Sequence, residues 1–346
     1  MPAFAESAAE PPLADSYYAL LRRAGGHDDN RNKDGCQVEV PMSECELPMI
    51  DVGCLTTGCG TPEERVACKA AIAAAAAEWG FFQVVNHGVR QELLDAMRRE
   101  QMRLFRLPFE AKTSAGLLND SYRWGTPTAT SSKQLSWSEA FHVQLAGISG
   151  NRCSYGELTT IRDVTQEVAN AMSKLANTLA IVLAESLGHT AGEQFPEGCD
   201  ERTCFLRLNR YPPCPFSPEA FGLVPHTDSD FLTVLCQDQV GGLQLMKGSR
   251  WVAVKPIPNA LIVNIGDLFQ AWSNNRYKSV EHKVVTNATT ERYSVAYFLC
   301  PSYDSPIGAC EEPSPYRTFT FGEYRRKVQE DVKKTGRKIG LPNFLM

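Results

Sequence analysis

The sequence has no long apolar run. No segment approaches the roughly 20 consecutive apolar residues that a membrane-spanning helix needs. The first residues also lack the basic stretch followed by an apolar stretch that marks a secretory signal. Positive charge is not in excess, because the formal net charge is −5. We therefore expect a cytoplasmic protein, with the nucleus left open as a second location, that binds neither membranes nor nucleic acids.

Paired metal-binding cysteines are missing as well, although the chain has 12 cysteines. None of them forms a Cys-x-x-Cys motif, which excludes a zinc ribbon and a thioredoxin-like redox site. Without a secretory signal, free thiols are expected. Histidine is scarce, with six residues in the chain. We expect His142 to be a satisfied core residue, and His226 and His282 are the two candidates for chemistry.

The distribution of glycine, proline and apolar residues divides the chain into four parts. Residues 1–46 are rich in Ala, Pro, Gly and charge, which predicts a flexible leader. Short β-like runs separated by turn residues fill residues 201–315 and favour an all-β sandwich or barrel such as a jelly roll. Residues 47–200 predict a mixed region of helices and strands that packs on this core. Residues 316–346 predict a C-terminal helix.

Several segments have the apolar periodicity or the end signals of helices. The first of these helices has a clear N-terminal signal, because Thr61 can act as N-cap, Pro62 suits the first turn and Glu64 completes a capping box. In the last, the basic residues are expected to form a solvated face rather than a binding patch. The predicted helices cover residues 61–80, 91–108, about 164–187 and 321–334.

A charged motif in an otherwise apolar stretch marks the candidate site. The sequence "VPHTDSD" at residues 224–230 precedes the apolar run "FLTVL". Side chains two residues apart in a strand point to the same side, so His226 and Asp228 are expected to face one site. His282, on a later predicted strand, could complete the set. Two histidines and one carboxylate form the facial triad typical of non-haem Fe(II). Zinc would accept similar ligands, and a lone His-x-Asp is more often a turn.

Two further patterns favour a metal site that also binds a carboxylate. Arg292 and Ser294 alternate on a later predicted strand, and a guanidinium beside a hydroxyl can hold a carboxylate through several hydrogen bonds. The strand before the His-x-Asp motif carries Arg207, Asn209 and Tyr211 at alternate positions. These two patterns weigh against reading the His-x-Asp motif as a mere turn.

Taken together, these motifs resemble the plant 2-oxoglutarate- and Fe(II)-dependent dioxygenases. The matching stretches are "NRYPPCP", "PHTD", "GGLQL", "NIGD", "YKSVEHKV" and "RYSVAYF", with "LPMID", "WGFFQVVNHG" and "LFRLPFEAK" nearer the N-terminus. The resemblance covers roughly residues 47–345. It implies a mainly β fold with flanking helices, in which a double-stranded β-helix (jelly roll) core at residues 201–315 follows an N-terminal α/β region.

The resemblance also implies the cofactors and their ligands. The enzyme would use Fe(II), with 2-oxoglutarate and O₂ as co-substrates and ascorbate as a helpful additive. The iron ligands, and therefore catalytic residues, would be His226, Asp228 and His282. Asp230 has no ligand role in the pattern, so we expect it to cap a turn or contact solvent.

The same resemblance assigns the co-substrate site. Arg292 and Ser294 would hold the distal carboxylate of 2-oxoglutarate, and Arg292 would thereby be essential for catalysis. Tyr211 and Asn209 would lie near the co-substrate.

Two longer stretches resemble the gibberellin 2-oxidases, in particular the branch that acts on C20 gibberellins. These are "YRWGTPTATSSKQLSWSEAFHVQLAGIS" and "PHTDSDFLTVLCQDQVGGLQLMKG". The resemblance implies 2β-hydroxylation of a small-molecule gibberellin, which inactivates the hormone. The same chemistry at another gibberellin position or on a flavonoid-type metabolite is the alternative. A non-catalytic hormone-binding protein and a zinc hydrolase fit the arginine and metal motifs less well.

A gibberellin precursor is a rigid apolar skeleton that bears carboxylates, so its pocket should be mainly apolar with one or two cationic anchors. For each candidate lining residue, a purely structural role is the alternative. The candidates for substrate contact are Arg207, Arg123, Tyr122, Trp124 and Phe298.

Overall fold

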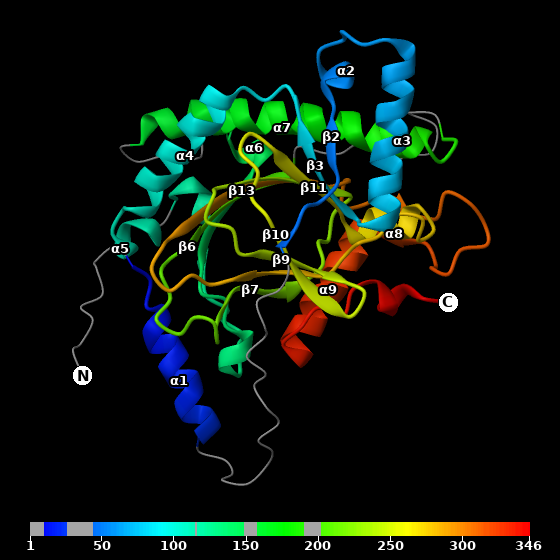
Figure 1. Cartoon of the computed structure of the whole chain (residues 1–346). Coiled ribbons are helices and arrows are strands. Elements are labelled where there is room, and N and C mark those ends of the chain that lie inside the picture. The colour runs from blue at the N-terminus through cyan, green and yellow to red at the C-terminus, as the bar shows by residue number, and fades with distance from the viewer. Residues whose placement is uncertain (1–9, 26–43, 115, 149–157, 190–201) are drawn as a thin grey trace.

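Two β-sheets face each other and form the centre of the protein, with helices packed around them (Figure 1). The computed structural model describes residues 10–25, 44–114, 116–148, 158–189 and 202–346. Strands from both sheets wind into a double-stranded β-helix, which confirms the predicted mainly β fold with flanking helices.

The larger sheet has eight strands and combines both halves of the chain. Strands of the N-terminal region pair directly with strands of the core, because β3 runs antiparallel to β11 and β5 runs antiparallel to β6. The N-terminal region therefore shares a sheet with the core rather than only packing on it. In order across the sheet, the strands are β2 (Met49–Asp51), β3 (Phe81–Val85), β11 (Leu261–Ile265), β8 (Leu232–Gln237), β13 (Arg292–Leu299), β6 (Phe205–Tyr211), β5 (Glu139–Gln144) and β4 (Tyr122–Trp124).

The smaller sheet has five strands and carries both candidate histidines. His282, the first residue of β12, lies opposite His226, the last residue of β7, in their antiparallel ladder. The order across the sheet is β1 (Glu44–Cys45), β10 (Arg250–Val254), β9 (Leu243–Lys247), β12 (His282–Val285) and β7 (Phe221–His226). A separate hairpin pairs β14 (Pro306–Ile307) with β15 (Phe319–Thr320).

Alternation along the strands of the larger sheet divides the core from the cavity. In β13 the odd-numbered Tyr293, Val295 and Tyr297 belong to the main hydrophobic core, whereas Ser294 and Phe298 line the space between the sheets. This follows from the period of two in a strand, which sends successive side chains to opposite faces.

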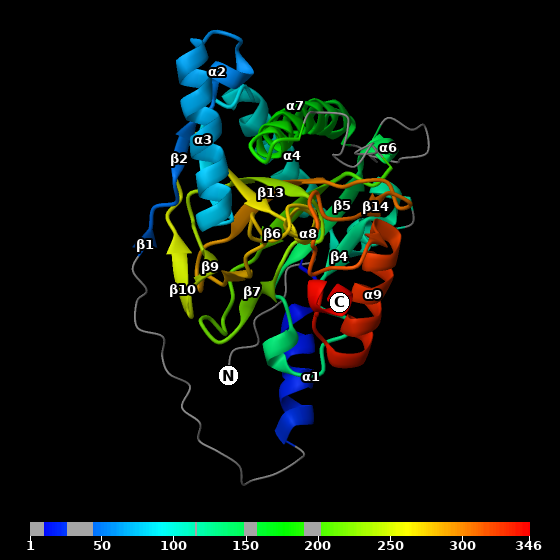
Figure 2. The ribbon, with the colours of Figure 1, turned by 90° about the vertical axis from the view of Figure 1, so that its right-hand side faces the viewer.

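Long helices cover the outer face of the larger sheet, as Figure 2 shows for α3, α4 and α7. The apolar stripe of α7 is buried, and each such side chain contributes about 1.5–3 kcal/mol to folding. The predicted capping box of α3 is confirmed, because Thr61 accepts a hydrogen bond from the Glu64 N–H and Glu64 accepts one from the Thr61 N–H. The helices besides α1 are α2 (Gly53–Thr56), α3 (Pro62–Glu78), α4 (Gln91–Phe105), α5 (Phe109–Lys112), α6 (Leu145–Ile148), α7 (Thr159–Glu185), α8 (Asp267–Trp272) and α9 (Phe321–Thr335), with 3₁₀ turns η1 (Leu118–Asp120), η2 (Ser132–Gln134) and η3 (Leu341–Phe344).

The N-terminal part contains a helix that we did not predict, α1 (Leu13–Gly25). Tyr17 of α1 stacks on Phe216 with 4.0 Å between ring centroids. Just before the helix, the Glu10 carboxylate accepts hydrogen bonds from both Nη atoms of Arg210, at 3.0 and 2.8 Å. The prediction of a flexible leader over residues 1–46 is therefore wrong for residues 10–25, because their partners lie far along the chain. The rest of that leader, apart from residues 44–46, lies outside the described residues.

Within the described part of the chain, no helix is long and apolar enough to cross a membrane.

Candidate active site

A cavity of about 360 Å³ lies between the two sheets and contains the predicted metal ligands. Its size falls within the range typical of small-molecule sites. Strands of both sheets, the loop after β7 and helix α9 contribute to its lining. The side chains group into three regions: the ligand triad, a polar wall from β6 and β13, and an aromatic wall that carries cations.

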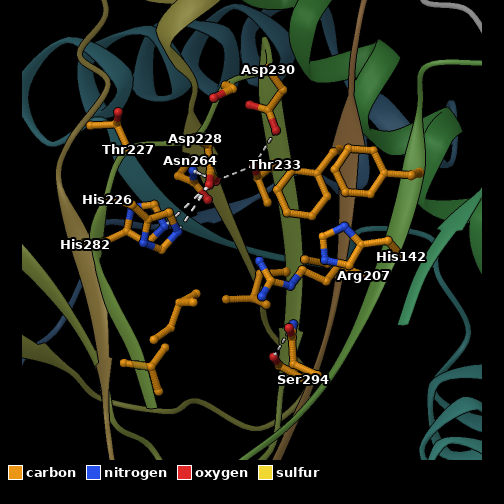
Figure 3. Close-up of a pocket in the computed structure, with 18 of the residues that line it drawn as sticks. His142, Arg207, His226, Thr227, Asp228, Asp230, Thr233, Asn264, His282 and Ser294 are labelled. Atoms are coloured by element: carbon orange, nitrogen blue, oxygen red, sulfur yellow. Dashed lines mark hydrogen bonds and ion pairs between the residues drawn. The ribbon is translucent and has the colours of Figure 1, made fainter. Parts of the chain in front are cut away.

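The structure brings the three predicted metal ligands together (Figure 3). The Asp228 Oδ1 atom lies 3.7 Å from the Nε2 atom of His226 and 3.7 Å from that of His282. One ligand atom from each residue lies within 4.8 Å of the other two. We predicted that strand alternation pairs His226 with Asp228. That reason is wrong, because β7 ends at His226 and the loop that follows returns Asp228 to the site.

The hydrogen bonds of the histidines prepare them to bind a metal ion. The Nδ1 atom of His226 lies 2.8 Å from the Val224 carbonyl oxygen, and that of His282 lies 3.1 Å from the Val280 carbonyl oxygen. A carbonyl can only accept, so each Nδ1 donates and each Nε2 keeps its lone pair toward the site. Burial and the neighbouring His282 hold the pKa of His226 below its usual range, which favours the neutral, ligating form.

Asp228 is fixed in the same way. Its Oδ2 atom accepts hydrogen bonds from the Thr233 hydroxyl at 2.6 Å and from the Asn264 amide at 2.8 Å, which leaves Oδ1 to the metal. Burial by itself would raise the pKa of Asp228, but the two imidazoles and these two hydrogen bonds lower it overall. Two imidazoles and one ionised carboxylate form the donor set that suits non-haem Fe(II), so the residues fit the metal that the sequence predicted.

Asp230 is not a ligand, as expected, but it does not contact solvent. It is 1% exposed, and burial together with the charge of Asp228 raises its pKa. The Thr233 hydroxyl lies 2.9 Å from Asp230 Oδ2 as well as near Asp228. Since Thr233 has one hydroxyl proton, a protonated Asp230 can donate to Thr233 while Thr233 donates to Asp228. Asp230 therefore belongs to the hydrogen-bond chain that supports the ligand.

Unpaired polar atoms concentrate on the wall formed by β6 and β13. Arg292 is 3% exposed, and its Nη2 donates to Gln237 at 2.8 Å. Its Nε and Nη1 atoms, however, are buried without a hydrogen-bond partner among the described residues, and so is Asn209 Oδ1. The Asn209 amide donates to the Ser294 hydroxyl at 3.2 Å, and the Arg292 guanidinium lies over the ring of Tyr211. The open N–H groups of Arg292 need an acceptor, for which an anionic ligand is suited, whereas the open Asn209 oxygen needs a donor.

The aromatic wall is formed by three parallel rings. Phe205 and Phe298 stack with centroids 4.4 Å apart, and His142 stacks with Phe205 at 5.8 Å between centroids. His142 is thus a cavity residue, and our prediction of a core histidine is wrong. The His142 side chain is exposed to the space inside the cavity, although protein atoms surround it. Burial and the nearby Arg207, the foremost of the charges around it, lower the pKa of His142, so it is neutral.

Two arginines border this wall. Arg207 lies in the cavity beside His142 (Figure 3), and its Nε is buried without a hydrogen-bond partner among the described residues. Arg325 of α9 reaches the cavity too, with its Nη1 donating to the Tyr303 hydroxyl at 3.0 Å. We predicted a solvated face rather than a binding patch for the basic residues of this helix; Arg325 is half-buried and also lines the cavity. The periodicity of α9 indicates that residues 321, 324 and 328 share a face. It does not indicate that Arg325, which lies beside them, borders a cavity.

The remaining predicted substrate residues lie elsewhere. Tyr122 and Trp124 of β4 are not among the residues that line the cavity. The Tyr122 hydroxyl donates to Glu139, and Trp124 packs edge-on against Phe109. Arg123 points its Nη1 at the Asp120 and Tyr122 carbonyl oxygens. We therefore retain Arg207 and Phe298 as substrate candidates and not these three.

The fold and site together define a class of protein. A double-stranded β-helix presents a facial triad on one side of a cavity and an open arginine on the other, which is the arrangement of a non-haem Fe(II) oxygenase that uses a carboxylate co-substrate.

Comparison with known proteins agrees with this class. Residues 202–301 match the 2OG-Fe(II) oxygenase superfamily, and residues 47–156 match the family described as "non-haem dioxygenase in morphine synthesis N-terminal". Among relatives, "Gibberellin 2-beta-dioxygenase 6" of Oryza sativa subsp. japonica is 67% identical over 99% of this chain and 98% of its own length. "Gibberellin 2-beta-dioxygenase 8" of Arabidopsis thaliana is 53% identical over 97% of this chain and 98% of its own length.

Solved structures show the same fold. The crystal structure of JOX2 in complex with 2OG, Fe and JA has a TM-score of 0.72 and 32% identity, and it covers 94% of this chain and 97% of its own. The chain belongs to the gibberellin 2-beta-dioxygenase family of plant 2-oxoglutarate- and Fe(II)-dependent dioxygenases. Its cofactor is Fe(II), its co-substrate is 2-oxoglutarate, and the facial triad is His226, Asp228 and His282.

Proposed function

We propose that this protein hydroxylates C20 gibberellins at the 2β position and thereby inactivates them. The observation that carries the proposal is the pair of open arginines, Arg292 and Arg207, in the one cavity that also holds the triad. The co-substrate is a dicarboxylate and the hormone precursor bears carboxylates, so each of these two ligands would need a cation in the cavity. The names of the relatives at 67% and 53% identity support the gibberellin as substrate.

The polar wall is proposed to bind 2-oxoglutarate. The free Nε and Nη1 atoms of Arg292 can donate to the distal carboxylate, and the Ser294 hydroxyl, on the same strand face, can add a third bond. Asn209 keeps Ser294 in place through its amide N–H. Gly222 allows the Tyr211 ring to approach, because a Cβ at this position would lie 2.9 Å from the Tyr211 Cδ1 atom.

Bound Fe(II), together with 2-oxoglutarate and O₂, supplies the oxidising power that inserts oxygen into a C–H bond. The protein's own residues do the positioning. His226, Asp228 and His282 hold the ion on one face, so that the opposite face stays open to ligands. The apolar rings and the depth of the cavity exclude water from the reacting carbon.

The aromatic wall is proposed to bind the gibberellin. A rigid polycyclic skeleton can pack against the ring edges of the stack formed by Phe298, Phe205 and His142. A carboxylate of the substrate would then accept from Arg207, whose Nε has no partner among the described residues, and Arg325 would add positive charge from α9. Because burial lowers the pKa of Arg207, a carboxylate partner would also relieve the cost of its buried charge.

A panel of gibberellins tests the proposal. The purified protein is incubated with Fe(II), 2-oxoglutarate, ascorbate and single C20 or C19 gibberellins, with a flavonoid as comparison, and the products are identified by mass spectrometry. We expect 2-hydroxylated C20 products and one succinate per product. Preferential turnover of C19 gibberellins would overturn the C20 assignment. Turnover of the flavonoid without 2-hydroxylation of any gibberellin would overturn the proposed function as a whole.

A further inference from the structure

Asp267 is a buried carboxylate that lies behind the metal site. It is the first residue of α8, directly after β11, and it is 3% exposed. It does not line the cavity, so it contacts neither metal nor substrate. A buried carboxylate costs free energy unless it is compensated, which raises the question of what it is paired with.

Four side chains from four separate segments converge on this carboxylate. The Oδ1 atom accepts from the Ser279 hydroxyl at 2.6 Å. The Oδ2 atom accepts from the Thr227 hydroxyl at 3.1 Å, from the Tyr324 hydroxyl and from the Lys338 ammonium at 2.8 Å. All of these donors compensate the buried charge, and Lys338 neutralises it.

Two of these donors belong to the segments that carry the metal ligands. Thr227 stands between the first two members of the triad, and Ser279 lies three residues before the third, His282. The backbone adds a further link, because the Asp267 N–H donates to the Asp228 carbonyl oxygen at 3.0 Å. Asp267 thus holds the loop after β7 and the approach to β12 at a fixed separation.

The other two donors come from the C-terminal part of the chain. Tyr324 belongs to α9, and Lys338 follows that helix. Besides Asp267, the Lys338 ammonium reaches the Thr227 carbonyl oxygen at 2.9 Å, between the two ligands. Gly340 packs closely against the same carboxylate, since a Cβ there would lie 3.0 Å from Asp267 Oδ2. Figure 2 shows α9 and the C-terminus running beside the β-helix.

We propose that Asp267 is a positioning residue for the iron centre and that Lys338 completes it, so that the C-terminal segment helps the triad to retain iron. Metal ligands must be held within about 0.5 Å of their working geometry. Outer partners that fix ligands are typically worth about 10–100-fold in metal affinity. Thr227 and Ser279 transmit this restraint from Asp267 to the ligand segments. The inference concerns the metal centre alone and does not depend on gibberellin being the substrate.

The test is an anaerobic titration of the metal-free protein with Fe(II) in the presence of 2-oxoglutarate. Binding is monitored through the charge-transfer absorption of the Fe(II)–2-oxoglutarate chelate. We expect Asp267→Asn and Lys338→Met to raise the dissociation constant for Fe(II) by about 10–100-fold. Lys338→Arg, which keeps the charge and the donors, should recover much of the affinity. The matched control is Lys334→Met on the exposed face of α9, which should bind like the unmodified protein.

Thermal unfolding of the metal-free variants separates positioning from folding. If Asp267→Asn fails to fold, the milder Thr227→Val and Ser279→Ala decide the matter, because each removes one hydrogen bond to the carboxylate. A several-fold weaker affinity for Fe(II) in these folded variants supports the proposal. Folded variants at Asp267, Lys338, Thr227 and Ser279 that all bind Fe(II) with unchanged affinity and an unchanged absorption band would overturn it.

Discussion

The two ends of the cavity differ in how their polar atoms are paired. At the triad, the outward-facing atoms of the ligands are already engaged: both histidine Nδ1 atoms meet carbonyl oxygens, and Asp228 Oδ2 accepts from two side chains. At the arginine end, Arg292 and Arg207 keep buried N–H groups without partners among the described residues. The triad end is preorganised to retain a metal ion, and the arginine end keeps donors open for ligands that bind and dissociate in each turnover.

This difference follows from the two kinds of ligand. A metal site gains affinity when its ligands cannot move, so outer hydrogen bonds that fix them are favourable. A carboxylate ligand must instead find donors that nothing else occupies, because a donor already paired inside the protein offers it little. The comparison predicts that mutations at the two ends will have separable effects.

The largest effect is expected at the triad. Asp228→Asn replaces the only anionic ligand, and we expect product formation to fall by more than the ~100-fold that removing an outer partner costs. Iron content after anaerobic loading, measured beside succinate release, checks the cause. Asp304→Asn, an exposed carboxylate, is the matched control and should leave both unchanged. An Asp228→Asn protein with full activity would show that the triad does not bind the catalytic iron.

The next effect is expected at the co-substrate wall. Arg292→Met removes two open donors, and hydrogen bonds to charged groups are worth about 1.5–3 kcal/mol each. We therefore expect the KM for 2-oxoglutarate to rise about 100-fold or more, while Fe(II) binding in the absence of 2-oxoglutarate stays within a factor of about two. Initial-rate kinetics and metal titration measure the two quantities. Arg250→Met at an exposed position is the control. An unchanged KM for 2-oxoglutarate would show that Arg292 does not anchor it.

A smaller effect is expected at the aromatic wall. Arg207→Met should raise the KM for the gibberellin by roughly 10–100-fold, because one charged hydrogen bond is lost, and should leave the KM for 2-oxoglutarate nearly unchanged. The two constants are measured in the same assay, again with Arg250→Met as control. If the variant instead raised the KM for 2-oxoglutarate and left the KM for the gibberellin unchanged, both arginines would bind the same ligand. The division of the cavity into two ligand sites would then be wrong.

Much of the site could be predicted because its signals are local. Alternation within single strands identified Arg292 with Ser294, and Arg207 with Asn209 and Tyr211, and the structure places all five in the cavity. The triad could be proposed because few histidines were available. The residue at which β7 ends could not be predicted, since it depends on how the loop after His226 bonds to the backbone of α8 and to Asn264 of β11.

Other parts depend on contacts between distant segments, which no local pattern encodes. Glu10, just before helix α1, is held by Arg210, which follows it by 200 residues, and Tyr17 of α1 stacks on the equally distant Phe216. Helix α9 brings Arg325 to a cavity built mostly of strands. His142 was misjudged because its neighbour Phe205 comes from a different strand. In β4, Tyr122 and Trp124 are near other cavity residues in the sequence, but they point toward Glu139 and Phe109.

The most direct test of the divided cavity is a crystal structure of the protein with Fe(II), 2-oxoglutarate and a C20 gibberellin, prepared without oxygen. We expect iron on His226, Asp228 and His282, with 2-oxoglutarate on Arg292. We also expect a gibberellin carboxylate on Arg207, with C2 the skeleton carbon nearest to the metal. A gibberellin bound outside the aromatic wall, or one that turns another carbon toward the iron while Arg207 stays unpaired, would contradict this arrangement.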